Sequence, residues 1–152
     1  MKKILTITLF VIFISCGTSR TYVTVDNKKL PNYMVSFLNE FENASVNYDS
    51  GKLIELLDSE YRDEQLNFFH KGNTENFLNE LFCGSFVSEA GFKCLMYNSI
   101  KQIKFIKAEN IQEGYTVYYM VNDGTYEIIC SWVVTVKTVN QKTTYGIFGA
   151  LG

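Results

Sequence analysis

The spacing of apolar residues changes near residue 100, and this change constrains the fold more than any other feature. Before it, apolar residues recur every three or four positions, as in Met34, Phe37, Leu38 and Phe41, which is typical of an amphipathic helix. After it, they alternate with polar residues, as in a strand with one buried face. Helices followed by strands predict an α+β domain, with the N-terminal helices packed on one face of an antiparallel sheet.

The helical half divides into several short segments. Pro31 favours the first turn of a helix. Glu40 and Glu42 lie outside the apolar stripe of this helix, and we expect them to face solvent. Asn73 or Thr74 can cap the last helix, because their side chains accept a hydrogen bond from a free backbone N–H group. We expect helices over residues 31–46, 53–59, 60–70 and 74–82.

The strand half is a meander of about four antiparallel strands. Asn122-Asp123-Gly124 is a strong hairpin signal, because these residue types tolerate the positive φ of tight turns. The strand after it carries polar side chains such as Lys137 on one face. Its other face is apolar, with Ile128, Cys130, Trp132, Val134 and Val136. Residues 85–99 fit neither period. We expect strands over residues 103–108, 115–121, 127–137 and 143–148.

The order of elements resembles the NTF2-like, or cystatin-like, superfamily over roughly residues 31–149. The resemblance rests on the N-terminal amphipathic helix, the segment YDSGKLIELLDSEY (Tyr48 to Tyr61) and the final meander. It implies a single domain at 31–152, in which a curved sheet and a long helix form a cone with a pocket at its wide end. Tyr115, Tyr119 and Trp132 are then possible pocket-lining residues, or simply core and cross-strand partners. Residues 62–99 depart from the family, because they read as mainly helical where many members carry a hairpin.

The N-terminus has the layout of an export signal. A short basic start is followed by eleven apolar residues or threonines at 4–14, fewer than the about 20 needed to span a bilayer. Ser15-Cys16-Gly17 then resembles the lipobox of bacterial lipoproteins, although Phe13 stands where Leu is commoner. The resemblance implies a signal peptide at 1–15, removal before Cys16, and lipid such as palmitate on that cysteine. An uncleaved buried helix and a plain signal peptide are the alternatives.

Residues 16–30 are then the lipidated N-terminus and a polar tether. Loss of residues 1–15 leaves 12 of the 14 basic residues against 16 acidic ones, so the net charge falls from −2 to −4. Such a chain has no electrostatic basis for binding nucleic acid, nor for attraction as a whole to an anionic membrane. We therefore expect attachment to the cell envelope through lipid alone, with the domain facing the periplasm or the cell exterior.

The remaining cysteines suggest one possible disulfide. In an oxidising compartment Cys83 and Cys94 can form a disulfide. Their spacing in the sequence does not fix the distance between them, so two free thiols are the alternative. Cys130 lies on the apolar face of its strand, which favours burial as a small hydrophobic residue. The C-x10-C spacing is not that of a zinc or redox motif, and we expect no metal site and no cofactor.

Candidates for catalysis are sparse. His70, the single histidine, sits at a predicted helix end, where it can stay solvated beside a cation. The acidic residues among 58–64 (Asp58, Glu60, Asp63 and Glu64, with Arg62) fit a solvated helix face better than a site for acid–base chemistry. The favoured hypothesis is a non-enzymatic module that binds a small apolar ligand or an envelope protein. The alternatives are an NTF2-like isomerase or hydrolase that uses His70 and one of these carboxylates, and a scaffold part of an envelope complex.

Overall fold

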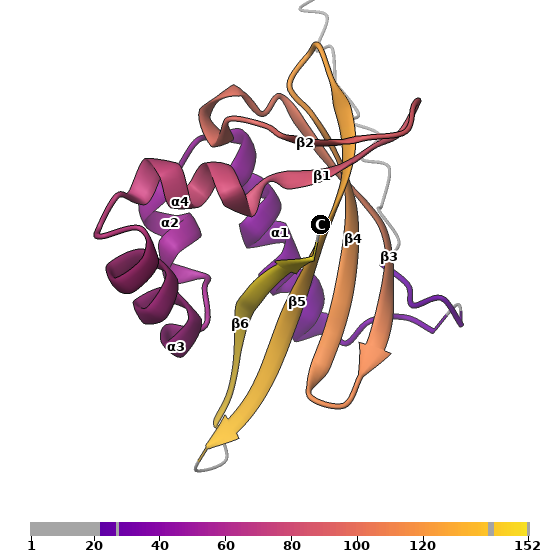
Figure 1. Ribbon diagram of the computed structural model, residues 1–152. Coiled ribbons are helices and arrows are strands. Elements are labelled where there is room, and N and C mark those ends of the chain that lie inside the picture. Colours follow the sequence, from indigo (N-terminus) through magenta and orange to yellow (C-terminus); the bar gives the residue numbers. More distant parts are fainter. Residues whose placement is uncertain (1–21, 27, 140–141, 152) are drawn as a thin grey trace, which may run out of the picture.

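The helices come first along the chain and gather on one side of an open sheet (Figure 1). The computed structural model describes residues 22–26, 28–139 and 142–151. Within them the elements are α1 (Asn32–Val46), α2 (Ser50–Glu55), α3 (Ser59–Arg62), η1 (Asp63–Phe69), α4 (Thr74–Leu81), β1 (Cys83–Phe86), β2 (Phe92–Cys94), η2 (Tyr97–Ser99), β3 (Gln102–Ile111), β4 (Gly114–Asn122), β5 (Glu127–Val139) and β6 (Lys142–Leu151). The predicted α+β class is confirmed.

The helices follow the predicted pattern closely. Pro31 directly precedes α1, whose apolar stripe is buried as expected. The Asn73 side chain accepts a hydrogen bond from the backbone N–H of Asn76, 3.1 Å away, and so caps α4. The third predicted helix is α3 continued by η1, a π-helical segment. The apolar spacing therefore located all four helical segments, and three of them agree to within about one residue at each end. The second was placed too late, because α2 spans Ser50–Glu55 and residues 56–58 form the linker to α3.

The sheet is antiparallel, with strand order β2-β1-β5-β4-β3, and β6 also pairs with β5. Strand β5 is long enough to share one edge between two partners. Its first residues pair with β1, as in Ser85 opposite Ile129, and its later residues pair with β6. Register shifts at Phe105/Lys107 and at Val133/Val134 interrupt two of the ladders, and such bulges bend a strand. The sheet stays open rather than closing into a barrel.

The predicted number of strands was too low. The structure has six strands in its described residues instead of about four, and the two additional ones form the β1–β2 hairpin. This hairpin lies in residues 62–99, which we expected to be mainly helical. Its strands have only four and three residues, too few for an alternating pattern to stand out.

The segment before α1 packs on the edge of β3. Val23 bridges Lys29 in a small hairpin, and Thr24 bridges Ala108 in a parallel sense. The Tyr22 and Leu30 side chains are buried. Half of the predicted tether, from Tyr22 onward, is thus in contact with the domain. The predicted signal peptide at 1–15 and the lipidation site Cys16 lie outside the described residues.

Candidate functional site

Aromatic side chains fill the space between α1 and the sheet. Trp132, Tyr119 and Phe82 are fully buried, and the Phe41 ring centroid lies 4.8 Å from that of Trp132. The Trp132 indole N–H donates to the Leu81 carbonyl over 2.8 Å, so the ring has one orientation. Two of the three residues proposed as pocket lining therefore lie in a packed core.

The third of these residues, Tyr115, is partly buried and lies at the start of β4. Burial, together with nearby Tyr33, raises the pKa of its hydroxyl above the ordinary value. Tyr33 in turn stacks on Tyr145, with 4.7 Å between ring centroids. These tyrosines come from α1, β4 and β6, and they keep the two layers together near the start of α1.

A surface hollow of about 270 Å³ lies where the α2–α3 linker meets β6. The linker continues the sheet: the Asp58 N–H donates to the Ile147 carbonyl over 2.9 Å, and the Ile147 N–H donates to the Leu56 carbonyl over 3.0 Å. Gly146 permits this approach, because a Cβ there would lie 2.6 Å from the Asp58 nitrogen. Backbone pairing therefore fixes the position of Asp58.

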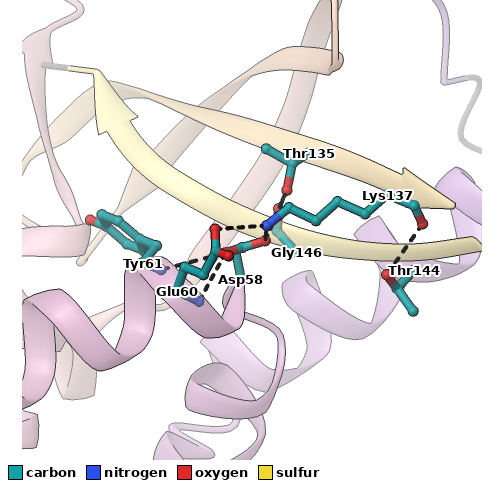
Figure 2. Close-up of polar contacts among 7 residues, drawn as sticks. All are labelled: Asp58, Glu60, Tyr61, Thr135, Lys137, Thr144 and Gly146. Atoms are coloured by element: carbon teal, nitrogen blue, oxygen red, sulfur yellow. Dashed lines mark hydrogen bonds and ion pairs between the residues drawn. The ribbon is translucent and has the colours of Figure 1, made fainter. Parts of the chain in front are cut away.

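The Asp58 carboxylate joins the helical layer to β5 at this hollow (Figure 2). Its Oδ1 accepts hydrogen bonds from the backbone N–H groups of Glu60 and Tyr61, which caps α3. Its Oδ2 lies 2.8 Å from Lys137 Nζ and 3.4 Å from the Thr135 hydroxyl. Lys137 also lies 3.2 Å from Glu60 Oε2, so one ammonium group holds two carboxylates.

These contacts keep both partners charged at neutral pH. Burial alone would raise the pKa of Asp58, but the Lys137 ammonium and the N–H groups of Tyr61 and Glu60 outweigh it, so the pKa lies below the ordinary value. The pKa of Lys137 is raised because its ammonium donates to Asp58 and Glu60. Neither group is thus tuned for proton transfer near neutral pH. The hollow presents fixed charges, with Arg62 and Glu55 also on its wall.

The expectation of a solvated acidic face was right for part of the segment and wrong for Asp58. Glu60, Asp63 and Glu64 are exposed, but Asp58 is only 6% exposed. Its partner Lys137 lies far away in sequence, on the face of β5 that was predicted to be polar. The one available signal was the aspartate directly before Ser59, at an N-cap position.

His70 contacts a carboxylate of α4, whereas the enzymatic hypothesis pairs it with a carboxylate of residues 58–64. Its Nε2 lies 3.2 Å from Glu80 Oε2, and its ring packs on Phe77 with 5.4 Å between centroids. The predicted helix end is confirmed, since His70 follows η1. The prediction of a solvated ring was wrong, because the His70 side chain is only 10% exposed. The structure thus pairs His70 with α4 rather than with residues 58–64.

The cysteines take two kinds of environment. Cys83 and Cys94 lie opposite each other in the β1–β2 hairpin, and their sulfur atoms are bonded. Cys130 is free and buried, and burial raises the pKa of its thiol to about 12. Such a thiol stays protonated and unreactive at neutral pH.

The structure also places a buried carboxylate where the sequence predicted an exposed one. Glu42 is 4% exposed, and its Oε1 lies 3.0 Å from the hydroxyls of both Tyr22 and Tyr119. Its side chain also borders a hollow of about 180 Å³ beside Lys101. The expectation that Glu42 faces solvent was wrong, because the segment before α1 covers this side of the helix.

Searches against family models, curated proteins and solved structures give no match for this chain. Within residues 22–26, 28–139 and 142–151, three or more His, Cys, Asp or Glu side chains are nowhere grouped as metal ligands. In the same residues, no helix combines the length and apolar character needed to cross a bilayer.

Proposed function

We propose that this protein is a lipid-anchored component of the bacterial cell envelope whose folded domain is a non-enzymatic binding or interaction module. The observation that carries the anchor is the position of Cys16, directly after a short apolar run and a small residue. The signal at 1–15 is removed, and lipid on Cys16 holds the protein in a membrane, with the domain facing the periplasm or the cell exterior. Two or three acyl chains suffice for stable anchoring.

We further propose that the domain is an NTF2-like cone. The position of α1 against one face of an antiparallel sheet supports this, as does the β1–β2 hairpin between the helices and the final meander. The cone is filled rather than hollow at Trp132 and Tyr119, both of which are fully buried. Binding through the outer surface to an envelope protein is therefore favoured over enclosure of an apolar ligand.

The contacts of the titratable groups favour binding over catalysis. Asp58 and Lys137 hold each other in their charged forms, which suits recognition of a polar partner. The enzymatic alternative needs His70 beside a carboxylate from 58–64, whereas the carboxylate that it contacts is that of Glu80. The carboxylate of Glu80 is largely exposed and is therefore poorly placed to act in a water-excluded site.

Metabolic labelling tests the anchor. Cells that express the full chain receive a palmitate analogue, and the Cys16→Ala variant is the matched control. We expect label on the wild-type protein only, and loss of the variant from the membrane fraction. Absence of label on the wild type, or equal membrane retention of the variant, would refute the lipid anchor.

A further inference from the structure

The two layers of the domain carry opposite net charge. Residues 31–82, which hold the helices, have ten acidic and three basic side chains, a net charge of −7. Residues 22–30 together with 83–151, which hold the sheet, have six acidic and eight basic side chains, a net charge of +2. The helical layer is thus strongly acidic and the sheet layer is weakly basic, although the net charge of the whole chain is small.

The chain enters the domain where β3, the edge strand of the positive layer, meets α1. The Tyr22 hydroxyl lies 2.6 Å from Asn39 Oδ1 and 3.0 Å from Glu42 Oε1, and the Tyr22 ring packs on Phe105 with 5.0 Å between centroids. The bridge from Thr24 to β3 continues this attachment. Figure 1 places this entry point on the β3 side of the molecule, remote from α3 and α4.

Four lysines lie along this side and form what we name the basic edge. They are Lys28 and Lys29 in the entry segment, Lys101 directly before β3, and Lys104 within it, and all four are exposed. None of the ion pairs within the described part of the chain involves them. Four solvated ammonium groups are therefore free to meet an anionic surface.

We propose that the basic edge faces the anionic leaflet in which the lipid is inserted, and that the acidic helical layer points away from it. This inference rests on the proposed anchor at Cys16. Tyr22 lies six positions after Cys16, and a chain segment of that length spans at most about 20 Å. The entry point can therefore come within the Debye length of about 8 Å over which the charge of the membrane surface acts. Lipid supplies attachment, and charge sets the orientation.

Site-directed quenching in vesicles tests this orientation with the lipidated full chain. Gln102→Cys on β3 and Asn76→Cys on α4 each introduce an exposed thiol. The native cysteines do not compete for a thiol-reactive fluorophore, since Cys16 is lipidated, Cys83 and Cys94 are bonded, and Cys130 is buried. Vesicles of phosphatidylcholine, alone or mixed with phosphatidylglycerol, carry a headgroup quencher. We expect stronger quenching at residue 102 than at residue 76 in the mixed vesicles, and a smaller difference at high salt.

Two double variants distinguish an effect of the basic edge from an effect of the net charge of the protein. A lysine near an anionic surface contributes about fivefold to such a preference. The double variant Lys28→Gln/Lys29→Gln should therefore reduce the preference roughly 25-fold. The control Lys52→Gln/Lys71→Gln changes net charge equally but lies in the helical layer, and should retain the preference.

Three outcomes would contradict the inference. Equal quenching at the two labelled sites in mixed vesicles, or stronger quenching at residue 76, would overturn the orientation while the anchor stands. Equal effects of the two double variants would overturn the role of the basic edge. A purified chain that carries no acyl group and does not enter vesicles would overturn the anchor, and this inference with it.

Discussion

Replacing Asp58 by Ala should destabilise the domain more than replacing it by Asn, because its carboxylate has two separable roles. One oxygen caps α3 through the N–H groups of Glu60 and Tyr61, 3.0 and 3.4 Å away. The other oxygen lies 2.8 Å from Lys137 Nζ. Asn keeps an acceptor at the cap but removes the charge, whereas Ala removes both.

The cap sets the expected difference between the two variants. Loss of an N-cap side chain costs about 1 kcal/mol, and Asn caps about as well as Asp. The Ala variant should therefore be less stable than the Asn variant by about 1 kcal/mol, which lowers the melting temperature by roughly 4 °C in a domain of this size. Both variants lose the ion pair, so this difference isolates the cap.

The charge is tested by the pH dependence. The pKa of Asp58 is lower in the folded state than in the unfolded state, so its charge stabilises the fold above the unfolded value of about 4. That stabilisation disappears as the pH falls through the folded pKa. The gap between wild type and Asp58→Asn should thus be complete at neutral pH and close in acid.

Urea unfolding followed by the fluorescence of Trp132, the one tryptophan of the chain, measures both quantities. Equal stability of the Ala and Asn variants would refute the capping role of Asp58. A gap between wild type and Asn that persists unchanged in strong acid would refute the role of its charge.

Three other variants test the packing of the domain. Gly146→Ala should cost about 1–3 kcal/mol, because its Cβ would meet the backbone of Asp58, whereas Gly149→Ala meets no atom within 4 Å and should be tolerated; urea midpoints compare them. Tyr119→Phe removes a donor to the buried Glu42 carboxylate and should cost about 1.5–3 kcal/mol, measured in the same way. Replacement of both cysteines of the β1–β2 disulfide by Ser should cost somewhat under 3 kcal/mol, because the bond closes a short loop; thermal unfolding without reductant checks this.

Local signals were sufficient where the chain's own periodicity or a turn motif determines the structure. Helix α1 could be predicted because Met34, Phe37, Leu38 and Phe41 lie on one stripe, and all four are buried. The β4–β5 turn could be predicted because Gly124 takes the positive φ that its position needs, and Asp123 accepts hydrogen bonds from the residues that follow.

Contacts between distant segments account for what was missed. Asp58 and Lys137 meet only because the α2–α3 linker pairs with β6, and no local pattern encodes that pairing. Glu42 is buried only because the segment that contains Tyr22 folds back over α1. The β1–β2 hairpin has strands too short to give a period, and the bond between Cys83 and Cys94 spans it. Sequence patterns thus predicted the elements better than the polar contacts between them.

We propose that the mature protein begins at a lipidated Cys16. Mass spectrometry of the N-terminal peptide, from protein purified out of membranes in detergent, tests it most directly. We expect a peptide that starts at Cys16, lacks residues 1–15 and carries the mass of two or three acyl chains. A peptide that starts at Met1, or one that contains an unmodified Cys16, would contradict it.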